Sequence, residues 1–472
     1  MLKGKIIVRG SVAMINIQSD SRKIKPGDTF IAVKCEVNDG HKYIENAVAA
    51  GATKVIVEQD GDYGVETLVV EDTRKYLNDY LKEHYNHLIE QMQLIGITGT
   101  NGKTTTAVLL HDALNLLGEK TAYIGTIGFY IRKKISNLPN TTVDICDIYD
   151  LLMQAYEEGC KNVVMEISSH ALENGRCETL SFDYTLFTNL TQDHLDEHGT
   201  MENYALAKQK LFHRLKPNGV AIINSDDSYR DYYLLEGNQN ITFGFGISDY
   251  QVTSYSMTST GTDFAYQIGQ KEYHAHTMLL GRYNIYNVLG VIVVLDQMKI
   301  AKEQITEVLP KLKPPVGRMD TILYKNSSII IDYAHTPDAF SNVFHTVKEF
   351  QKGNIYTVFG CTGNRDRTKR PIMTNMVAQN SKYFIITNDD PHFEDEHQIV
   401  EDMIAELEAD TYEICFDRRQ AIRKGIDMLK KNDILLILGK GHEEFMIKGK
   451  EYIPFNDKKE VLAYLEEKGT EM

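Results

Sequence analysis

Short apolar runs that end in polar residues recur along this chain. The run "LIGI", which begins at Leu94, leads into a glycine-rich turn and then into "TTTAVLLHDALNLLG", a segment typical of a helix. Similar runs open the segments "NVVMEISSH" (162–170), "YTLFTNLTQDH" (184–194) and "GVAIINSDD" (219–227). This alternation predicts an α/β fold with a parallel sheet, whose strand ends carry polar groups to the edge where ligands bind.

The flanking regions show the same kind of alternation. Residues 1–90 combine Pro-Gly and Asp-Gly turns with strands and an alanine-rich helix, as in a small α/β unit. The periodicity is lost at "LKPPVGRMD" (312–320), which indicates a linker. Four more apolar strands then end in polar loops: "SIIIDYAHTPDAF", "IYTVFGCTGNRD", "YFIITNDDPH" and "DILLILGKGHEE". In the first of them we expect Thr336 to cap a helix and Pro337 to occupy its first position.

Length and composition narrow the class of protein. A chain of 472 residues is too long for one hydrophobic core, and we predict three domains, at residues 1–90, 91–316 and 317–472. The net charge of −15, with acids and bases interleaved, argues against a nucleic-acid-binding face. Six scattered cysteines without a CxxC pair indicate a reducing compartment. Neither a signal peptide nor a membrane span is expected, so we predict a cytoplasmic protein.

The segment "GITGTNGKTTT" (96–106) has the features of a phosphate-binding loop between a strand and a helix. Glycines let backbone N–H groups surround a phosphate, Lys103 supplies a positive charge, and Thr104 can bind magnesium. The spacing departs from the strict pattern, because Ile97 stands where the first glycine would fall. The loop predicts ATP and magnesium as cofactors, but a kinase, a hydrolase and a ligase would all fit.

Further motifs give the chain a specific resemblance. They are "GTNGKTTT", "MEISSHAL", "FTNLTQDHLDEHGTMENYALAKQKLF", "GRYNIYNVLG", "DYAHTPDA", "GCTGNRDRTKRPIM" and "GKGHEE". Together they resemble the Mur ligases, and among these the MurE type, which adds an amino acid to UDP-N-acetylmuramoyl-L-alanyl-D-glutamate in peptidoglycan synthesis. The resemblance implies a three-domain architecture: an N-terminal domain for the UDP-sugar, a central P-loop ATPase domain with a parallel sheet, and a Rossmann-like C-terminal domain for the amino acid.

The resemblance also implies a reaction and a set of residues around ATP. The γ-carboxylate of the D-glutamyl residue is phosphorylated by ATP, and the amino group of the incoming amino acid then displaces phosphate. One magnesium ion would be held by Thr104 and Glu166, and a second by Glu166, His194 and Lys208. Lys208 would serve as a carbamate (N6-carboxylysine), because a protonated ammonium group would repel the ion. The residues expected to bind ATP are Gly99, Thr100, Asn101, Gly102, Lys103, Thr104, Thr105, Asn287, Arg318 and Asp332, and those expected to act in catalysis are Lys103, Glu166, His194 and Lys208.

The UDP-sugar site is assigned by the same resemblance. Its expected members are Ser21, Asn140, Thr141, Thr142, Ser168, Asn174 and Arg176. Two positions depart from the family, since Asn174 replaces the usual glutamine and Val143 a proline. The amide group at position 174 is kept, so we expect its contact to survive, if need be through water.

The tetrapeptide at residues 389–392 is expected to select the amino acid. Diaminopimelate-adding enzymes have Asp-Asn-Pro-Arg there, whereas this chain has Asp389, Asp390, Pro391 and His392. Because a bidentate arginine is missing and an acid is added, we expect L-lysine, with L-ornithine, diaminopimelate or a specialised paralogue's substrate as alternatives. A turn without ligand contacts is the simpler interpretation of these four residues. The other expected contacts of the amino acid are Arg365, Gly439 and Glu443.

Two other interpretations of the whole chain are possible alternatives to a MurE-type ligase. One is another amide ligase of this superfamily, of the folylpolyglutamate or cyanophycin type, which residues 21–47 disfavour because they resemble a uridine-binding module. The other is a nucleotide-binding subunit without catalysis, which the intact residues around the phosphate loop disfavour. We expect a monomer that takes a UDP-N-acetylmuramoyl dipeptide and a free amino acid.

Overall fold

The computed structural model describes residues 8–9, 12–13, 15–34, 39–258, 260–408 and 410–469. The chain divides into two compact units, of which the first contains residues 1–251 and 289–308 and the second residues 252–288 and 309–472. Within the described part of the chain, every helix is too short or too polar to cross a lipid bilayer. Cys35 lies outside the described residues, and the five cysteines inside them are free thiols.

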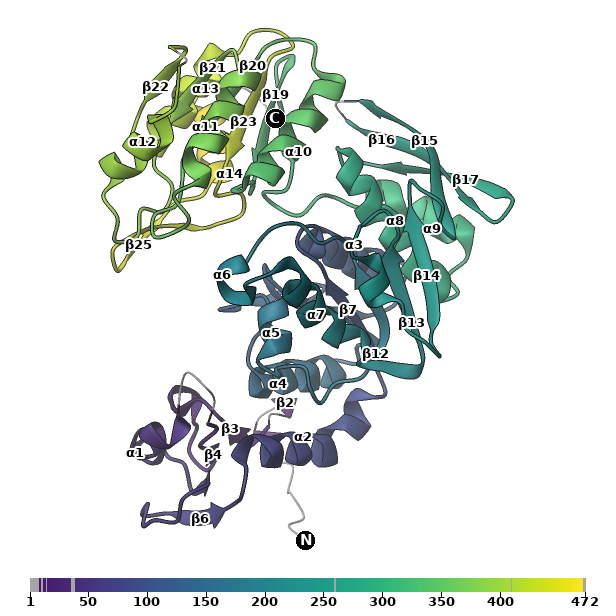
Figure 1. Cartoon of the computed structure of the whole chain (residues 1–472), viewed down its shortest axis with the longest axis vertical. Helices are drawn as coiled ribbons and strands as arrows, with labels where there is room; N and C mark the ends of the chain where they lie inside the picture. The colour runs from purple at the N-terminus through teal and green to yellow at the C-terminus, as the bar shows by residue number, and fades with distance from the viewer. Residues whose placement is uncertain are drawn as a thin grey trace. The chain divides into compact units, whose positions relative to one another are not determined.

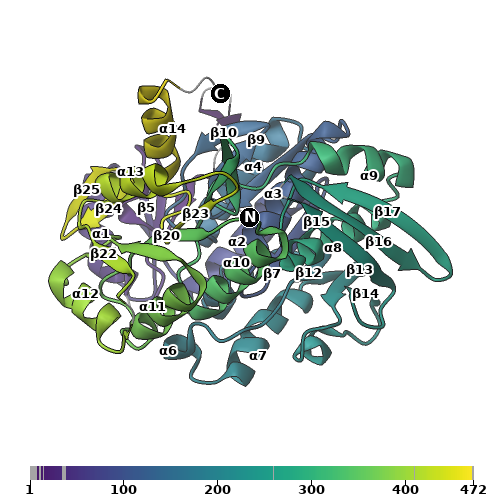
Figure 2. The ribbon, with the colours of Figure 1, turned by 90° about the horizontal axis from the view of Figure 1, so that it is seen from above.

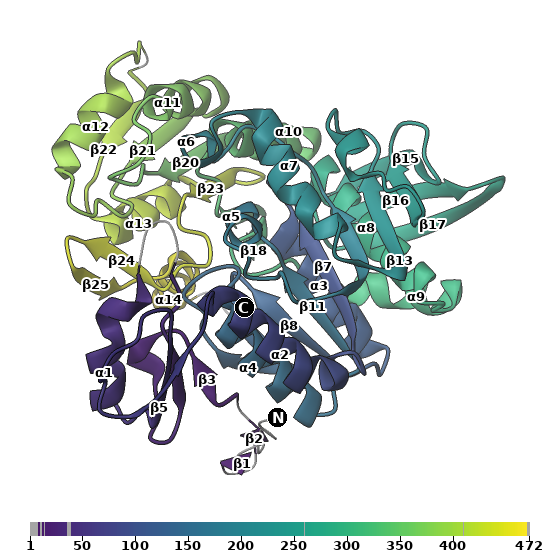
Figure 3. The ribbon, with the colours of Figure 1, turned by 60° about the horizontal axis from the view of Figure 1, so that its bottom comes forward.

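The first unit begins with a small parallel sheet in the order β3-β4-β5-β6, drawn in purple in Figure 3. Its core contains Phe30, Val55 and Val57 from the strands and Ile44 and Ala47 from α1. The elements of this region are β1 (Val8–Arg9), β2 (Val12–Ala13), β3 (Ile17–Gln18), η1 (Ser21–Lys23), β4 (Thr29–Ile31), η2 (Gly40–Tyr43), α1 (Ile44–Ala49), β5 (Lys54–Val57) and β6 (Glu66–Val69).

The rest of the first unit is built on a larger sheet in which β8, β11, β7, β12, β13 and β14 run parallel. The strands β9 and β10 extend it in antiparallel fashion at one edge. The helix α3 packs against β7, β8 and β11, and α2 packs against α4. The predicted strands at 94–97, 162–166, 184–187 and 219–224 are confirmed as parts of β7, β11, β12 and β13.

The bounds of these elements are α2 (Thr73–Ile89), β7 (Gln93–Thr98), α3 (Lys103–Leu116), β8 (Thr121–Gly125), β9 (Gly128–Ile131), β10 (Lys133–Ser136), α4 (Ile145–Glu157), β11 (Asn162–Glu166), α5 (Ser169–Glu173), β12 (Phe182–Phe187), α6 (Leu195–His198), α7 (Met201–Phe212), β13 (Leu215–Asn224), η3 (Arg230–Tyr233) and β14 (Gln239–Gly244). They are followed by β15 (Tyr250–Thr258), β16 (Gly261–Ile268), β17 (Lys271–Thr277), α8 (Arg282–Gln297), α9 (Lys302–Val308) and η4 (Leu309–Lys311).

The second unit contains a six-stranded sheet in the order β18-β19-β23-β20-β21-β22, parallel except for β18. Successive residues of each strand face opposite sides of the sheet. Ile330 and Leu436 share a core cluster with residues of α10, α11 and α12, whereas Ile329 and Leu435 share one with residues of α13 and α14. The three helices α10, α11 and α12 are drawn in green in Figure 1. The helices α13 and α14 lie side by side in Figure 2. Helices on both faces give this sheet the Rossmann-like form that was predicted.

The bounds in this region are β18 (Asp320–Tyr324), β19 (Ser327–Asp332), α10 (Pro337–Phe350), β20 (Ile355–Phe359), α11 (Lys369–Asn380), β21 (Tyr383–Ile386), α12 (Glu396–Ile404), β22 (Tyr412–Ile414), α13 (Arg418–Met428), β23 (Ile434–Leu438), β24 (Phe445–Lys448), β25 (Glu451–Pro454) and α14 (Asp457–Glu467). The predicted cap is confirmed, because the Thr336 hydroxyl accepts the N–H of Ala339 and Pro337 begins α10. Residues 312–319, where a linker was predicted, form neither helix nor strand.

Candidate active site

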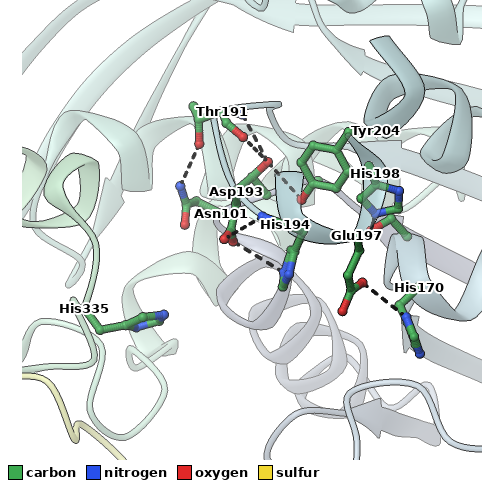
Figure 4. A network of polar contacts seen from close by, with 12 residues as sticks. Asn101, His170, Thr191, Asp193, His194, Glu197, His198, Tyr204 and His335 are labelled. Atoms are coloured by element: carbon green, nitrogen blue, oxygen red, sulfur yellow. Dashed lines mark hydrogen bonds and ion pairs between the residues drawn. The ribbon is translucent and has the colours of Figure 1, made fainter. Parts of the chain in front are cut away.

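The phosphate loop joins β7 to α3 and is held by the segment after β12. Gly99 has a φ of 148°, and a Cβ there would lie 1.9 Å from the hydroxyl oxygen of Thr188. That hydroxyl donates to the carbonyl oxygen of Asn101 at 2.6 Å, and the amide of Asn101 donates to the Thr191 hydroxyl at 3.3 Å (Figure 4). Only glycine permits this close approach, so the loop keeps its shape and leaves the N-terminus of α3 as an anion site.

Two lysines share one acceptor in this loop. The Nζ atoms of Lys103 and Lys208 each donate to the carbonyl oxygen of Gly99 at 2.9 Å. Lys208 is buried, and its Nζ lies 4.3 Å from the centroid of the Tyr204 ring. Burial lowers the pKa of Lys208 well below its usual value, and the charge of Lys103 lowers it further. Lys208 therefore loses its proton more readily than an exposed lysine does, and the neutral amine is the form that combines with carbon dioxide.

Glu166, at the end of β11, is a buried carboxylate surrounded by donors. The Thr104 hydroxyl donates to its Oε2 at 2.8 Å. Thr126 donates its backbone N–H to Oε1 at 3.0 Å and its hydroxyl to Oε2 at 3.1 Å, and the Tyr123 hydroxyl donates to Oε1. Thr104 and Glu166 thus place two oxygen ligands together beside the phosphate loop. Oxygen ligands are what magnesium requires, so this pair fits the ion.

His194 directly precedes α6 and contacts Tyr204. Its backbone has a φ of 52°, its Nε2 is 3.4 Å from Oδ2 of Asp193, and its ring meets the Tyr204 ring edge-on. The ring of His198 stacks on the same tyrosine with a centroid distance of 4.9 Å. Figure 4 shows both imidazoles around Tyr204. Tyr204 therefore connects His194 with Lys208, although both nitrogen groups suit magnesium less well than a carbamate oxygen would.

Several expected UDP-sugar residues come together next to Glu166. The Thr142 hydroxyl donates to the backbone oxygen of Glu166 at 2.9 Å and accepts the N–H of Ser168 at 3.0 Å. Arg176 donates to the carbonyl oxygen of Thr142 at 2.7 Å. The Thr141 hydroxyl lies 3.0 Å from that of Thr126. The substrate carboxylate is expected here, beside the phosphate loop.

The remaining UDP-sugar candidates are less closely grouped. Asn140 is exposed, and the side chain of Asn174 donates to the carbonyl oxygen of His170 within its own helical turn at 2.8 Å. Ser21 lies in η1 of the small N-terminal sheet region. The segment around Ser21 is tied to α4, because Ser19 donates to Asp144 at 3.2 Å and Lys23 pairs with Asp147 at 2.5 Å.

The expected adenosine residues lie in the second unit. Asp332, at the end of β19, accepts the N–H groups of Met319 at 2.7 Å and Ala334 at 2.8 Å. Burial raises the pKa of Asp332, and Arg318 opposes the shift. The guanidinium of Arg318 lies 4.7 Å from the centroid of the Tyr333 ring. Asn287 is buried in α8 and donates to the Asn284 side chain at 2.9 Å.

Three of the expected amino-acid residues surround a buried lysine. The Nζ of Lys440 is 2.8 Å from Oδ1 of Asp390, 2.7 Å from Oε2 of Glu443 and 3.7 Å from Oδ1 of Asp389. The same Asp390 oxygen accepts the N–H of Ile447 at 2.9 Å. Burial lowers the pKa of Lys440, but the three carboxylates outweigh it and raise the pKa overall. Asp390 is therefore paired within the protein, which weakens the electrostatic argument for a lysine substrate.

His392 is bound to the hairpin of β24 and β25 through its backbone. Its N–H donates to the carbonyl oxygen of Ile447 at 3.1 Å, and its own carbonyl accepts the N–H of Gly449 at 2.6 Å. In this pairing His392 lies opposite Lys448. Gly439 follows β23 in the same region as Lys440, Arg365 is exposed, and Pro391 is buried.

Three residues in these contacts were missed by the sequence reasoning. Lys440 stood in the quoted "GKGHEE" motif, and a lysine between two glycines after a strand was a usable signal. Tyr333, whose hydroxyl donates to Glu443 at 3.3 Å, stood in "DYAHTPDA". The sequence offers no sign that Tyr123 belongs to the site, because a tyrosine there fits the apolar pattern of a buried strand.

Comparison with known families agrees with the resemblance. Residues 14–93 match the Mur ligase family catalytic domain, residues 97–295 the Mur ligase middle domain, and residues 317–441 the Mur ligase glutamate ligase domain. These matches do not test the predicted domain boundaries at 90 and 316, which stay a proposal.

Relatives and solved structures cover nearly the whole chain. A UDP-N-acetylmuramoyl-L-alanyl-D-glutamate–2,6-diaminopimelate ligase of Aquifex aeolicus is 41% identical, covering 93% of this chain and 91% of the relative. One from Bacillus cereus is 37% identical, covering 96% and 94%. A solved structure of a ligase of that name has a TM-score of 0.71 at 31% identity, over 97% and 96% of the chains. MurF of Thermotoga maritima, at 17% identity and a TM-score of 0.67, shares the fold.

The chain therefore belongs to the Mur ligase family, and within it to the MurE type. It is an ATP-dependent acid–amino-acid ligase of peptidoglycan synthesis. The predicted family, three-domain fold and enzyme class are confirmed. L-lysine as the added amino acid is not confirmed, and the diaminopimelate alternative is better supported.

Proposed function

We propose that this ligase joins diaminopimelate to the γ-carboxylate of the D-glutamyl residue of UDP-N-acetylmuramoyl-L-alanyl-D-glutamate. The observation that carries the proposal is the similarity to ligases named for diaminopimelate, at 37% and 41% identity over more than nine-tenths of the chain. The pairing of Asp390 with Lys440 supports it, because the extra acid is bound by an internal cation.

L-lysine is the second candidate. It is favoured by His392, which stands where a bidentate arginine would hold the distal carboxylate of diaminopimelate.

Another residue can supply the positive charge that diaminopimelate needs. Lys448 lies opposite His392 in the backbone pairing. Lys448 is 59% exposed and its Nζ lies 3.1 Å from Glu396, so it is accessible to a carboxylate. We propose His392 and Lys448 as the replacement for the missing arginine.

The first chemical step brings two anions together. An oxygen of the γ-carboxylate attacks the terminal phosphorus of ATP, ADP leaves, and an acyl phosphate forms. Lys103 and the N-terminal N–H groups of α3 would bind the phosphates and reduce the repulsion. The substrate carboxylate would approach past Thr142, Ser168 and Arg176, which lie beside Glu166. The amine of the amino acid then attacks the acyl carbon, and phosphate leaves.

The carbamate on Lys208 is part of the proposal. A buried lysine with a lowered pKa spends more time as the neutral amine, which can attack carbon dioxide. The carbamate would replace a positive charge beside Lys103 with a negative one. Magnesium bound by Thr104, Glu166, His194 and the carbamate would neutralise charge on the phosphates and the attacking carboxylate.

Phosphate release tests the choice of amino acid. The purified enzyme is given ATP, magnesium and UDP-N-acetylmuramoyl-L-alanyl-D-glutamate, with diaminopimelate, lysine and ornithine supplied separately. We expect the highest kcat/KM with diaminopimelate. A preference for lysine or ornithine would contradict the proposal, and no turnover with any of the three would indicate a specialised paralogue. Monomeric state and cytoplasmic location stay expectations.

A further inference from the structure

The carboxylate of Glu166 is fully occupied by protein donors. An ionised carboxylate offers about four lone-pair positions. Four donors approach Glu166: the hydroxyls of Thr104, Tyr123 and Thr126, and the backbone N–H of Thr126. If Glu166 is to bind a metal ion, at least one of these donors has to withdraw.

The arrangement of the four donors indicates which one withdraws. Oε1 accepts the Tyr123 hydroxyl and the Thr126 N–H, and neither group is a candidate metal ligand. Oε2 accepts the Thr104 hydroxyl, whose oxygen is itself a candidate ligand. When a metal ion binds Oε2, it replaces the hydrogen bond from Thr104. The Thr104 hydroxyl oxygen can then bind the same ion. The Thr126 hydroxyl has a second partner in Thr141, at 3.0 Å.

Tyr123 is held firmly in this position. It is 1% exposed, and its ring packs edge-on against His111 and Tyr130 at centroid distances of 6.1 and 5.7 Å. Its hydroxyl oxygen accepts the N–H of Ile127 at 3.4 Å while the hydroxyl donates to Glu166. Gly125 leaves the necessary room, because a Cβ there would lie 2.3 Å from Oε1 of Glu166 and 2.5 Å from the Tyr123 hydroxyl.

We propose that Tyr123 is a positioning residue for the metal site: with the Thr126 N–H it occupies Oε1 of Glu166, so that the carboxylate presents Oε2 alone to magnesium. This inference rests on the proposed role of Glu166 as a metal ligand. It does not depend on which amino acid the enzyme adds. Partners that orient a metal ligand typically account for about 10- to 100-fold in metal affinity.

The test is the Tyr123→Phe variant, which removes the hydroxyl and keeps the ring. Mn²⁺ binding in the presence of ADP is measured by electron paramagnetic resonance, which requires no turnover. We expect the Mn²⁺ affinity to fall by about 10- to 100-fold. In the ligase assay the magnesium concentration for half-maximal rate should rise by a similar factor, and excess magnesium should restore most of kcat.

Matched variants separate this role from a loss of packing. Tyr184→Phe removes another buried hydroxyl, which donates to the carbonyl oxygen of Gln297 at 3.5 Å, and should bind Mn²⁺ normally. Glu166→Gln should weaken Mn²⁺ binding more than Tyr123→Phe. Gly125→Ala, whose methyl group would displace the carboxylate or the phenol, should reproduce the loss in affinity if Tyr123→Phe fails to fold.

The outcomes distinguish the two levels of the proposal. Unchanged Mn²⁺ affinity in Tyr123→Phe, together with weakened binding in Glu166→Gln, would overturn the role of Tyr123. Unchanged affinity in Glu166→Gln would overturn the metal site on which it rests. A fall in kcat of Tyr123→Phe that excess magnesium does not restore, at normal Mn²⁺ affinity, would also overturn the positioning role.

Discussion

Lys208 shows how much one residue depends on its surroundings. On an amphipathic helix a lysine is ordinarily a solvated charge, but here its Nζ is enclosed and shares the Gly99 carbonyl with Lys103. A second ammonium group at that acceptor is unfavourable, because the two charges repel each other in a medium with little water. The carbamate would remove the repulsion and supply an oxygen ligand.

Lys208→Ala should therefore abolish ligation. We expect kcat to fall by more than about 100-fold, because several kcal/mol of charge stabilisation depend on the metal site. A short carboxylic acid such as acetate should restore part of the activity by occupying the space of the carbamate. The control is Lys210→Ala on the same helix, where a half-exposed lysine pairs with Glu173 at 2.9 Å. Full activity of Lys208→Ala without added acid would refute the carbamate.

Asp150 is a second residue whose properties come from its position. It accepts the N–H of Ile15 at 2.9 Å and the amide of Gln18 at 3.1 Å, and so joins α4 to the N-terminal segment. Burial raises its pKa from 3.8 to about 6, although the bond from Ile15 opposes the shift. Between these two values the folded protein binds more protons than the unfolded chain, so stability falls as pH rises through this range.

Asp150→Asn should remove this pH dependence. The variant should gain stability relative to the wild type as pH rises from about 4 to about 7, by at most about 3 kcal/mol. The measurement is the difference in Tm between the two proteins across that range. A difference that does not change with pH would show that Asp150 titrates in the folded protein as it does in the unfolded chain.

At the scale of elements, the loop after β21 and the hairpin of β24 and β25 act as one structure. Asp390 accepts the N–H of Ile447, and His392 exchanges backbone hydrogen bonds with Ile447 and Gly449. The tetrapeptide at 389–392 is therefore positioned by residues more than fifty positions further along. The hairpin therefore has to be considered together with the tetrapeptide when the choice of amino acid is explained.

Lys448→Met tests whether the hairpin contributes to substrate choice. If Lys448 binds the distal carboxylate of diaminopimelate, kcat/KM for diaminopimelate should fall about tenfold, as for loss of one charged hydrogen bond. Any turnover of lysine, which lacks that carboxylate, should be unchanged. Lys450→Met on the same hairpin is the control. Equal losses with both amino acids would show that Lys448 acts through the structure of the hairpin.

At the scale of the whole molecule, the sequence predicted the scaffold better than the contacts. The strands before Glu166, Thr188, Asp332 and Asp389 and the cap of α10 were predicted, because apolar runs and capping residues are local signals. The partners of the buried charges were not predicted. Tyr123 and Glu166 are 43 positions apart, and Lys440 and Asp390 are 50. Periodicity reports which face of an element is buried, but it does not report which side chains meet there.

The preference for lysine was not confirmed, and its argument had the same weakness. In the tetrapeptide alone, Asp390 looks like a free acid. In the fold, Lys440 follows β23 and pairs with Asp390. Residues 289–308 belong to the first compact unit and 252–288 to the second, and the predicted boundaries at 90 and 316 stay a prediction.

The most direct test of the account is a competition for one acceptor. The enzyme is incubated with ATP, magnesium, UDP-N-acetylmuramoyl-L-alanyl-D-glutamate and equal concentrations of diaminopimelate, lysine and ornithine, and the product is identified by mass spectrometry. We expect the diaminopimelate adduct, which is heavier than the lysine adduct by the mass of CO2 because a carboxyl group replaces a hydrogen. A product containing lysine or ornithine as its main component would contradict it.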